Sequence, residues 1–68
     1  MYEEHSIVVT TVDIFREEYY IPEGSEGAIV SIYNKGKGYA VEFPDLIGNP
    51  VVTIYPNEII LDDKIITS

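Results

Sequence analysis

The chain has 68 residues, and its twelve Asp and Glu outnumber four Lys and Arg, which gives a formal net charge of −8. Such a surface repels nucleic acid and anionic membranes, because both are bound through Lys and Arg. The absence of cysteine excludes disulfides and thiolate metal sites. The acidic start, Met1–His5, is unlike a secretory signal, and every apolar run is far shorter than a membrane span. We therefore predict a single cytoplasmic domain over residues 1–68 that binds neither nucleic acid nor membrane.

The first predicted strand is Ile7–Val12, which is rich in Val and Thr. Its alternation does not decide which face points inward. The inward face is either Ile7, Val9 and Thr11 or Val8, Thr10 and Val12. The next segment, Asp13–Ile21, contains two β-forming tyrosines and runs directly into a proline. We predict a long loop with an apolar underside there rather than a helical turn.

A hairpin is predicted between Pro22 and Phe43. Gly24 and Gly27 can supply the positive φ angles of a tight turn, and the strand Gly27–Tyr33 follows. The polar turn 34–38 offers Gly36 and Gly38 for the same purpose, and its length suits a hairpin. The second strand of this hairpin is Tyr39–Phe43.

The remaining elements are short. Pro44–Pro50 is a turn-rich connection to a strand over Val51–Tyr55, and Pro56–Glu58 reads as a short 3₁₀ turn. A brief strand, Ile59–Leu61, precedes a polar turn at 62–64 and an apolar tail, Ile65–Ile66.

Five short strands without a long helix predict an all-β fold, a small five-stranded antiparallel SH3-like barrel. Such barrels serve as binding scaffolds more often than as enzymes. The predicted inward side chains are Val30, Ile32, Val41, Phe43, Val52, Ile54 and Ile59, with Ala28 where the barrel is tight.

Four short patterns follow one another along the chain: Val-Val-x-Thr-x-Asp, Gly-x-x-Gly-x-Ile-Val, Tyr-x-Val-Glu-Phe, and Gly-Asn before Val-Thr-Ile. With them the chain resembles, over nearly its whole length, a family of small bacterial proteins with an SH3-like barrel, a domain of unknown function. The segment Phe15–Tyr20 is longer than the family's pattern. The resemblance implies that the chain has no catalytic residue. It also implies a protein that accompanies or neutralises a toxin-like protein. The matching residues are Val8, Val9, Thr11, Asp13, Gly24, Gly27, Ile29, Val30, Tyr39, Val41, Glu42, Phe43, Gly48, Asn49, Val52, Thr53 and Ile54.

No set of residues in the sequence indicates catalysis. Nucleophilic catalysis needs a base beside its nucleophile, and the single histidine, His5, lies in an N-terminal segment that we expect to be mobile. The carboxylate pairs Glu3–Glu4, Glu17–Glu18 and Asp62–Asp63 are adjacent in sequence, so on a strand they would point to opposite faces. They lack EF-hand spacing. We predict a protein that is not an enzyme and binds no metal or cofactor.

The charge favours a basic protein as the partner. Glutamates would attract it and tyrosines would anchor it, and the predicted partner-binding residues are Glu17, Glu18, Tyr19, Tyr20, Glu23, Glu26 and Tyr55. Tyr19 or Tyr20 with Tyr55 and Pro56 could form an aromatic groove of the kind that binds proline-rich peptides. The first interpretation is an immunity or inhibitor protein that neutralises a basic toxin such as a nuclease. The alternative is an adaptor that docks on a larger protein through its aromatic loop.

Overall fold

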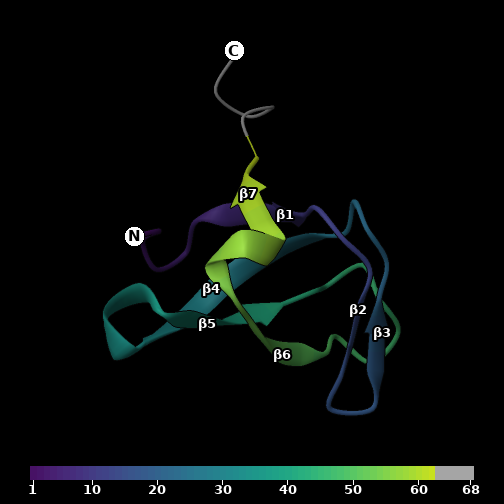
Figure 1. The fold of residues 1–68 in the computed structure, drawn as a ribbon. Helices are drawn as coiled ribbons and strands as arrows, with labels where there is room; N and C mark the ends of the chain where they lie inside the picture. Colours follow the sequence, from purple (N-terminus) through teal and green to yellow (C-terminus); the bar gives the residue numbers. More distant parts are fainter. Residues whose placement is uncertain (63–68) are drawn as a thin grey trace.

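Two antiparallel sheets organise the computed structural model, which describes residues 1–62 (Figure 1). The larger has the strand order β6-β5-β4-β1-β7, with β1 (Ile7–Thr10), β4 (Glu26–Tyr33), β5 (Gly38–Glu42), β6 (Val51–Ile54) and β7 (Ile59–Leu61). The smaller is a hairpin of β2 (Ile14–Arg16) and β3 (Tyr19–Ile21). No α-helix occurs within residues 1–62, so the predicted all-β class and five-stranded antiparallel sheet are confirmed. The predicted tail, Ile65–Ile66, and most of the polar turn before it lie outside the described residues.

The segment predicted as a long loop, Asp13–Ile21, is instead the β2–β3 hairpin. Glu17 (φ 54°) and Glu18 (φ 70°) connect its strands in the left-handed conformation that a two-residue hairpin turn requires. A Glu-Glu pair lacks the Asn-Gly signature of such turns, so the local sequence does not predict a hairpin turn here. The predicted apolar underside exists, because Ile14 and Ile21 are paired and buried.

The predicted inward face is wrong from the start of β4 to its centre. Ala28, predicted to face inward, is only half-buried and lies outside the core, whereas Gly27 beside it is buried. Val30 is 37% exposed, whereas its neighbour Ile29 is fully buried opposite Val41. The β4–β5 register shifts between Ile29 and Ser31, and the extra residue of this bulge reverses which side chains face the core. The predictions for β5, β6 and β7 are confirmed, and the core consists of Val8, Ile14, Ile21, Ile29, Tyr39, Val41, Phe43, Val52, Ile54 and Ile59, with Ile32 half-buried against it.

The structure also decides between the two faces of β1. Val8 and Thr10 are buried, and the Thr10 hydroxyl donates to the carbonyl of Pro22 at 2.9 Å. The predicted 3₁₀ turn is confirmed as η2 (Pro56–Glu58), which leads into β7.

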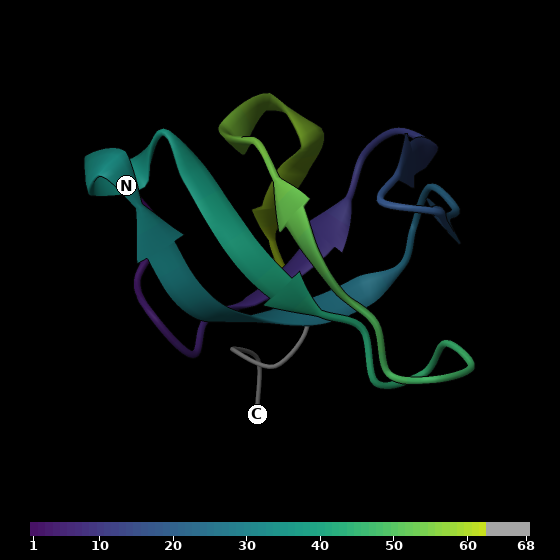
Figure 2. The same cartoon turned by 90° about the horizontal axis from the view of Figure 1, so that it is seen from below.

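The N-terminal segment is held against the sheet rather than mobile. The backbone N–H of His5 donates to the carbonyl of Ile29 at 2.7 Å, and that of Tyr2 donates to the hydroxyl of Tyr39 at 2.9 Å. This segment and η1 (Asn34–Gly36) lie at one end of the molecule, and the β2–β3 hairpin lies at the other (Figures 1 and 2).

The glycines expected to supply positive φ angles do so only in part. Gly24 (φ 88°) and Gly36 (φ 98°) adopt that conformation, and Gly27 and Gly38 do not. Gly27 is required for space, because a Cβ there would lie 2.6 Å from Cγ1 of Val41 and 2.8 Å from a backbone carbonyl.

Candidate functional site

The β2–β3 hairpin presents two faces with different chemistry. Its register pairs Ile14 with Ile21, Phe15 with Tyr20 and Arg16 with Tyr19. Because side chains alternate along a strand, the first and third pairs share the face that packs on the larger sheet, and the middle pair points away from it. The predicted anchors Tyr19 and Tyr20 therefore belong to different surfaces.

The outward face carries a stacked aromatic pair. The rings of Phe15 and Tyr20 lie 4.6 Å apart at an interplanar angle of 22°, and these residues are 76% and 51% exposed. Glu17 and Glu18 form the tip of the same hairpin and are also exposed. The tip therefore combines apolar area with negative charge.

On the inward face, Arg16 joins the hairpin to β6 and η2. Its guanidinium forms a two-pronged ion pair with Glu58, with both N···O distances at 2.9 Å, and also donates to the carbonyl of Thr53. It lies 4.9 Å from the ring centroid of Tyr55, in cation–π geometry. The hydrogen bonds from Arg16 hold the pKa of Glu58 below its ordinary value of 4.5, although desolvation acts in the opposite direction. The same hydrogen bonds raise the pKa of Arg16.

These charged groups also cover the outer edge of β6. The N–H of Thr53 donates to the Glu17 carboxylate at 3.1 Å, and its carbonyl accepts from Arg16 at 2.9 Å. The N–H of Tyr55 donates to Glu58 at 2.9 Å. A strand adding to this edge would need those backbone groups, so the side chains block strand addition there.

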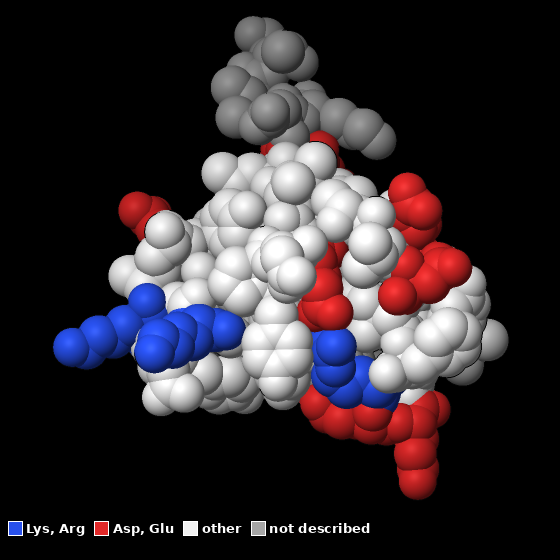
Figure 3. All heavy atoms as spheres, viewed as in Figure 1, with Lys and Arg blue, Asp and Glu red and all other residues white. Residues whose placement is uncertain are grey.

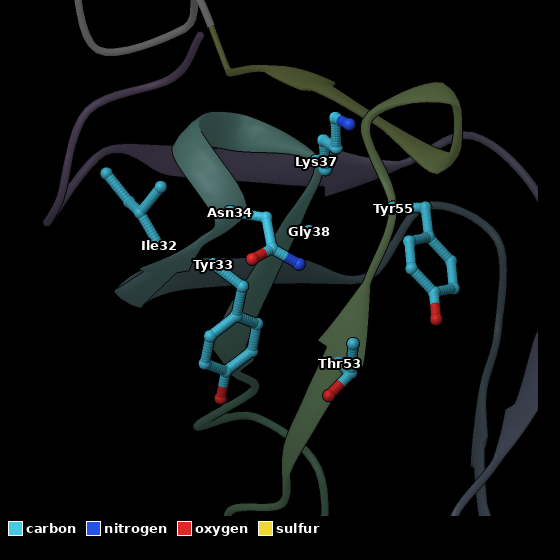
Figure 4. A pocket seen from close by; sticks show the side chains of 7 residues that line it. All are labelled: Ile32, Tyr33, Asn34, Lys37, Gly38, Thr53 and Tyr55. Atoms are coloured by element: carbon cyan, nitrogen blue, oxygen red, sulfur yellow. The ribbon is translucent and has the colours of Figure 1, made fainter.

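A second aromatic surface lies on the large sheet beside the hairpin. We call it the tyrosine groove, an open cavity of about 530 Å³ lined by Ile32, Tyr33, Asn34, Lys37, Gly38, Thr53 and Tyr55 (Figure 4). Tyr33 pairs with Gly38 across the β4–β5 hairpin, and Tyr55 directly follows β6. The groove therefore forms only when β4, β5 and β6 are assembled.

Charge is distributed unevenly between the two ends of the molecule. Lys35 and Lys37 lie in and beside η1, and Figure 3 shows blue side chains at that end. Red side chains predominate on the hairpin side in the same view. A ligand crossing the tyrosine groove would therefore meet positive charge at one end and negative charge at the other.

The predicted site residues do not form one surface. Glu17, Glu18, Tyr19 and Tyr20 are together on the hairpin, Tyr55 adjoins it through Arg16, and Glu23 follows it. Glu26 instead begins β4, paired with Val9. Sequence reasoning missed the contributions of Arg16, Tyr33 and Lys37. The sequence carried no signal for Tyr33, because the predicted turn 34–38 puts Tyr39 opposite it, whereas in the structure β5 begins one residue earlier and Gly38 lies opposite Tyr33.

Comparisons with known proteins identify a family without assigning it an activity. A family model described as a domain of unknown function (DUF4926) matches residues 4–60. Neither the curated proteins nor the solved structures gave a significant match. Within residues 1–62 there is no group of three or more His, Asp or Glu side chains placed to hold a metal ion. None of the helical segments described there has the length and apolar character needed to cross a membrane.

Proposed function

The chain belongs to the DUF4926 family, a domain of unknown function, and from the hairpin geometry and the net charge we propose that it is a non-catalytic protein-binding module. Its partner in this proposal is a basic protein, which it neutralises by covering a positively charged surface. A nuclease toxin is the kind of protein that carries such a surface. The binding surface consists of Phe15, Glu17, Glu18 and Tyr20 at the hairpin.

An SH3-like barrel is the architecture that we propose for this module. Three features support it: the strand order β6-β5-β4-β1-β7, the hairpin inserted between β1 and β4, and the 3₁₀ turn before the last strand. Barrels of this size present loops and hairpins at the rim of a rigid sheet. The β2–β3 hairpin would be one such rim element.

The exposed Phe15–Tyr20 stack is the observation that carries the proposal. A phenylalanine that is 76% exposed leaves a large apolar area in water, and aromatic groups of this kind are typical anchors of protein interfaces. Stacking on Tyr20 at 4.6 Å limits the freedom of both rings, so less side-chain entropy is lost on binding. The net charge of −8 would accelerate encounter with a basic partner.

The second candidate is an adaptor that docks on a larger protein through the same aromatic pair. The contact between Glu17 and Thr53 favours it, because one of the two tip carboxylates is already used inside the molecule. The two candidates differ in salt dependence. Neutralisation of a basic surface requires an association rate that falls steeply with salt, whereas aromatic docking does not.

The test begins with capture of the partner from the native cell and continues with binding kinetics on the purified, identified protein. Tyr20→Ala should accelerate dissociation about 30-fold, which corresponds to a hot spot of about 2 kcal/mol. Glu18→Gln should instead slow association. The matched control is Glu4→Gln, which removes the same charge from the N-terminal segment, and this segment lies at the opposite end of the molecule (Figure 1).

Three outcomes would contradict the proposal. Unchanged dissociation for Tyr20→Ala would show that the stack is not an anchor. An association rate that ignores salt, or that responds equally to Glu4→Gln, would reject the basic-partner form and leave the adaptor. Turnover of a substrate by the purified chain would reject both forms.

A further inference from the structure

The tyrosine groove has a buried glycine, Gly38, as its floor between two aromatic walls. A Cβ placed on Gly38 would lie 3.7 Å from two ring carbons of Tyr55 and 3.8 Å from a ring carbon of Tyr33. Gly38 therefore lies between the rings, and Figure 4 shows both rings pointing the same way on either side of Gly38 and Thr53. Any other residue at this position would fill the space between the tyrosines.

The Tyr55 wall is held in place before any ligand arrives. Arg16 lies 4.9 Å from the ring centroid and is itself fixed by the two-pronged contact with Glu58. The N–H of Tyr55 is also bound to Glu58. Tyr55 is nonetheless 46% exposed, and Tyr33 is 44% exposed. The groove thus offers two accessible rings, and at least one of them would lose little freedom on binding.

The polar rim gives the groove a direction. Lys37 and Asn34 belong to the turn at one end, and no residue within 1–62 forms an ion pair with Lys37. At the other side the N–H of Thr53 donates to the negatively charged Glu17 carboxylate at 3.1 Å. A ligand with an acidic group at one end would be oriented by Lys37.

The covered edge of β6 restricts the backbone conformation of a peptide ligand. Strand addition needs the N–H and carbonyl of Thr53, and both are occupied by Glu17 and Arg16. A polyproline II segment needs no such ladder, because it has no internal hydrogen bonds and binds aromatic grooves through its rings and free carbonyls. A nucleic acid base could stack on the same rings, but the acidic chain would repel its phosphates.

We propose that the tyrosine groove is a second binding site, separate from the hairpin surface, for a proline-containing peptide in the polyproline II conformation. A proline ring enters the space over Gly38 between Tyr33 and Tyr55. The Tyr33 hydroxyl and the Asn34 amide donate to peptide carbonyls. An acidic residue of the peptide lies next to Lys37.

The test is a titration of the isotope-labelled full chain with short synthetic peptides, followed by NMR. The probes are a proline-rich peptide with one aspartate, made with the aspartate at either end, and a control in which alanines replace the prolines. One of the two aspartate peptides should shift the amide signal of Gly38 in the tyrosine groove, and the alanine control should not.

Variants of the groove should weaken binding of that peptide while leaving the fold intact. Tyr33→Ala should reduce affinity about tenfold, as expected for loss of an aromatic anchor. Gly38→Ala should do the same, because its new methyl fits at ordinary contact distances but occupies the floor. The matched control is Phe15→Ala, which removes an equally accessible ring from the outward face of the hairpin and should leave peptide affinity unchanged.

Lys37→Glu provides a test that does not depend on removing apolar packing. This exposed residue can change sign without disturbing the core, and the variant should prefer the same peptide with lysine in place of aspartate. The proposal is overturned if neither aspartate peptide shifts Gly38 at about 1 mM, where even weak complexes form. Equal binding of the alanine control, or loss of binding in Phe15→Ala, would also overturn it. The hairpin proposal is tested separately, by the rate at which the captured partner dissociates from Tyr20→Ala.

Discussion

Replacement of Gly27 by alanine should destabilise the protein strongly, although its backbone conformation is open to any residue. The new Cβ would lie 2.6 Å from Cγ1 of Val41 and 3.0 Å from a ring carbon of Phe43, where carbon atoms normally stay about 3.5–4.0 Å apart. Both neighbours are fully buried, so neither has space to move into. The third contact, 2.8 Å to the carbonyl of Glu42, is with a backbone held by strand pairing.

The magnitude follows from these contacts. Overpacking at a rigid site costs about 1–3 kcal/mol, and here side-chain and backbone contacts are both too short. Replacing glycine also lowers the conformational entropy of the unfolded chain, which stabilises the folded protein by about 0.4–1 kcal/mol. Because both kinds of contact are too short, the upper end of the overpacking range applies, and a net loss of about 2 kcal/mol follows. This is a large part of the roughly 3–10 kcal/mol expected for a domain of this length.

Thermal unfolding followed by circular dichroism measures the effect. Gly27→Ala should lower Tm by roughly 8–16 °C, because each kcal/mol shifts a small domain by about 4–8 °C. The control is Gly38→Ala, a second sheet glycine without positive φ, whose added methyl has 3.7 Å of room. It should stay within about 1 kcal/mol of the wild-type stability. Equal Tm values for the two variants would refute the steric argument.

Three further predictions concern the core, the ion pair and the covered edge. Phe43→Ala should lower the free energy of unfolding in urea by about 3–5 kcal/mol, whereas Val30→Ala at the bulge should change it by about 0.5 kcal/mol or less, and a reversal of that order would contradict the bulge assignment. The pKa of Glu58 is lower in the folded state, so the Glu58 carboxylate stabilises the folded protein fully above its ordinary pKa of 4.5, and this stabilisation is lost as pH falls through the lower folded value. Glu58→Gln should flatten this part of a curve of unfolding free energy against pH. An unchanged curve would show that other carboxyls dominate the acid dependence. Arg16→Met frees the carbonyl of Thr53 and should increase concentration-dependent self-association in sedimentation velocity relative to wild type; sedimentation identical to wild type at every concentration would show that Arg16 does not protect the edge.

The sequence by itself determined the five strands of the larger sheet and most of their faces. Alternation of β-branched and aromatic side chains is a local property, so the inward positions Val41, Phe43, Val52 and Ile54 could be assigned correctly. The 3₁₀ turn at Pro56–Glu58 was equally local, because proline begins it.

Only the tertiary structure decided where this alternation is interrupted. The bulge beside Val30 depends on how β4 meets β5, and no signal within β4 marks it. The turn at Glu17 and Glu18 uses residues that seldom adopt positive φ, and it persists because the buried pair of isoleucines and the contacts of Arg16 secure the hairpin on the sheet.

The candidate sites follow the same division. Composition and the segment Phe15–Tyr20 indicated an acidic aromatic surface. Tyr19 and Tyr20 fall on opposite faces because both lie on a strand, β3, rather than in the predicted loop. The tyrosine groove joins Tyr33 and Tyr55, which are far apart in the sequence and meet because β5 lies between β4 and β6. Periodicity reports which face a side chain occupies, whereas proximity between distant segments arises from sheet order and register, which packing of the whole chain selects.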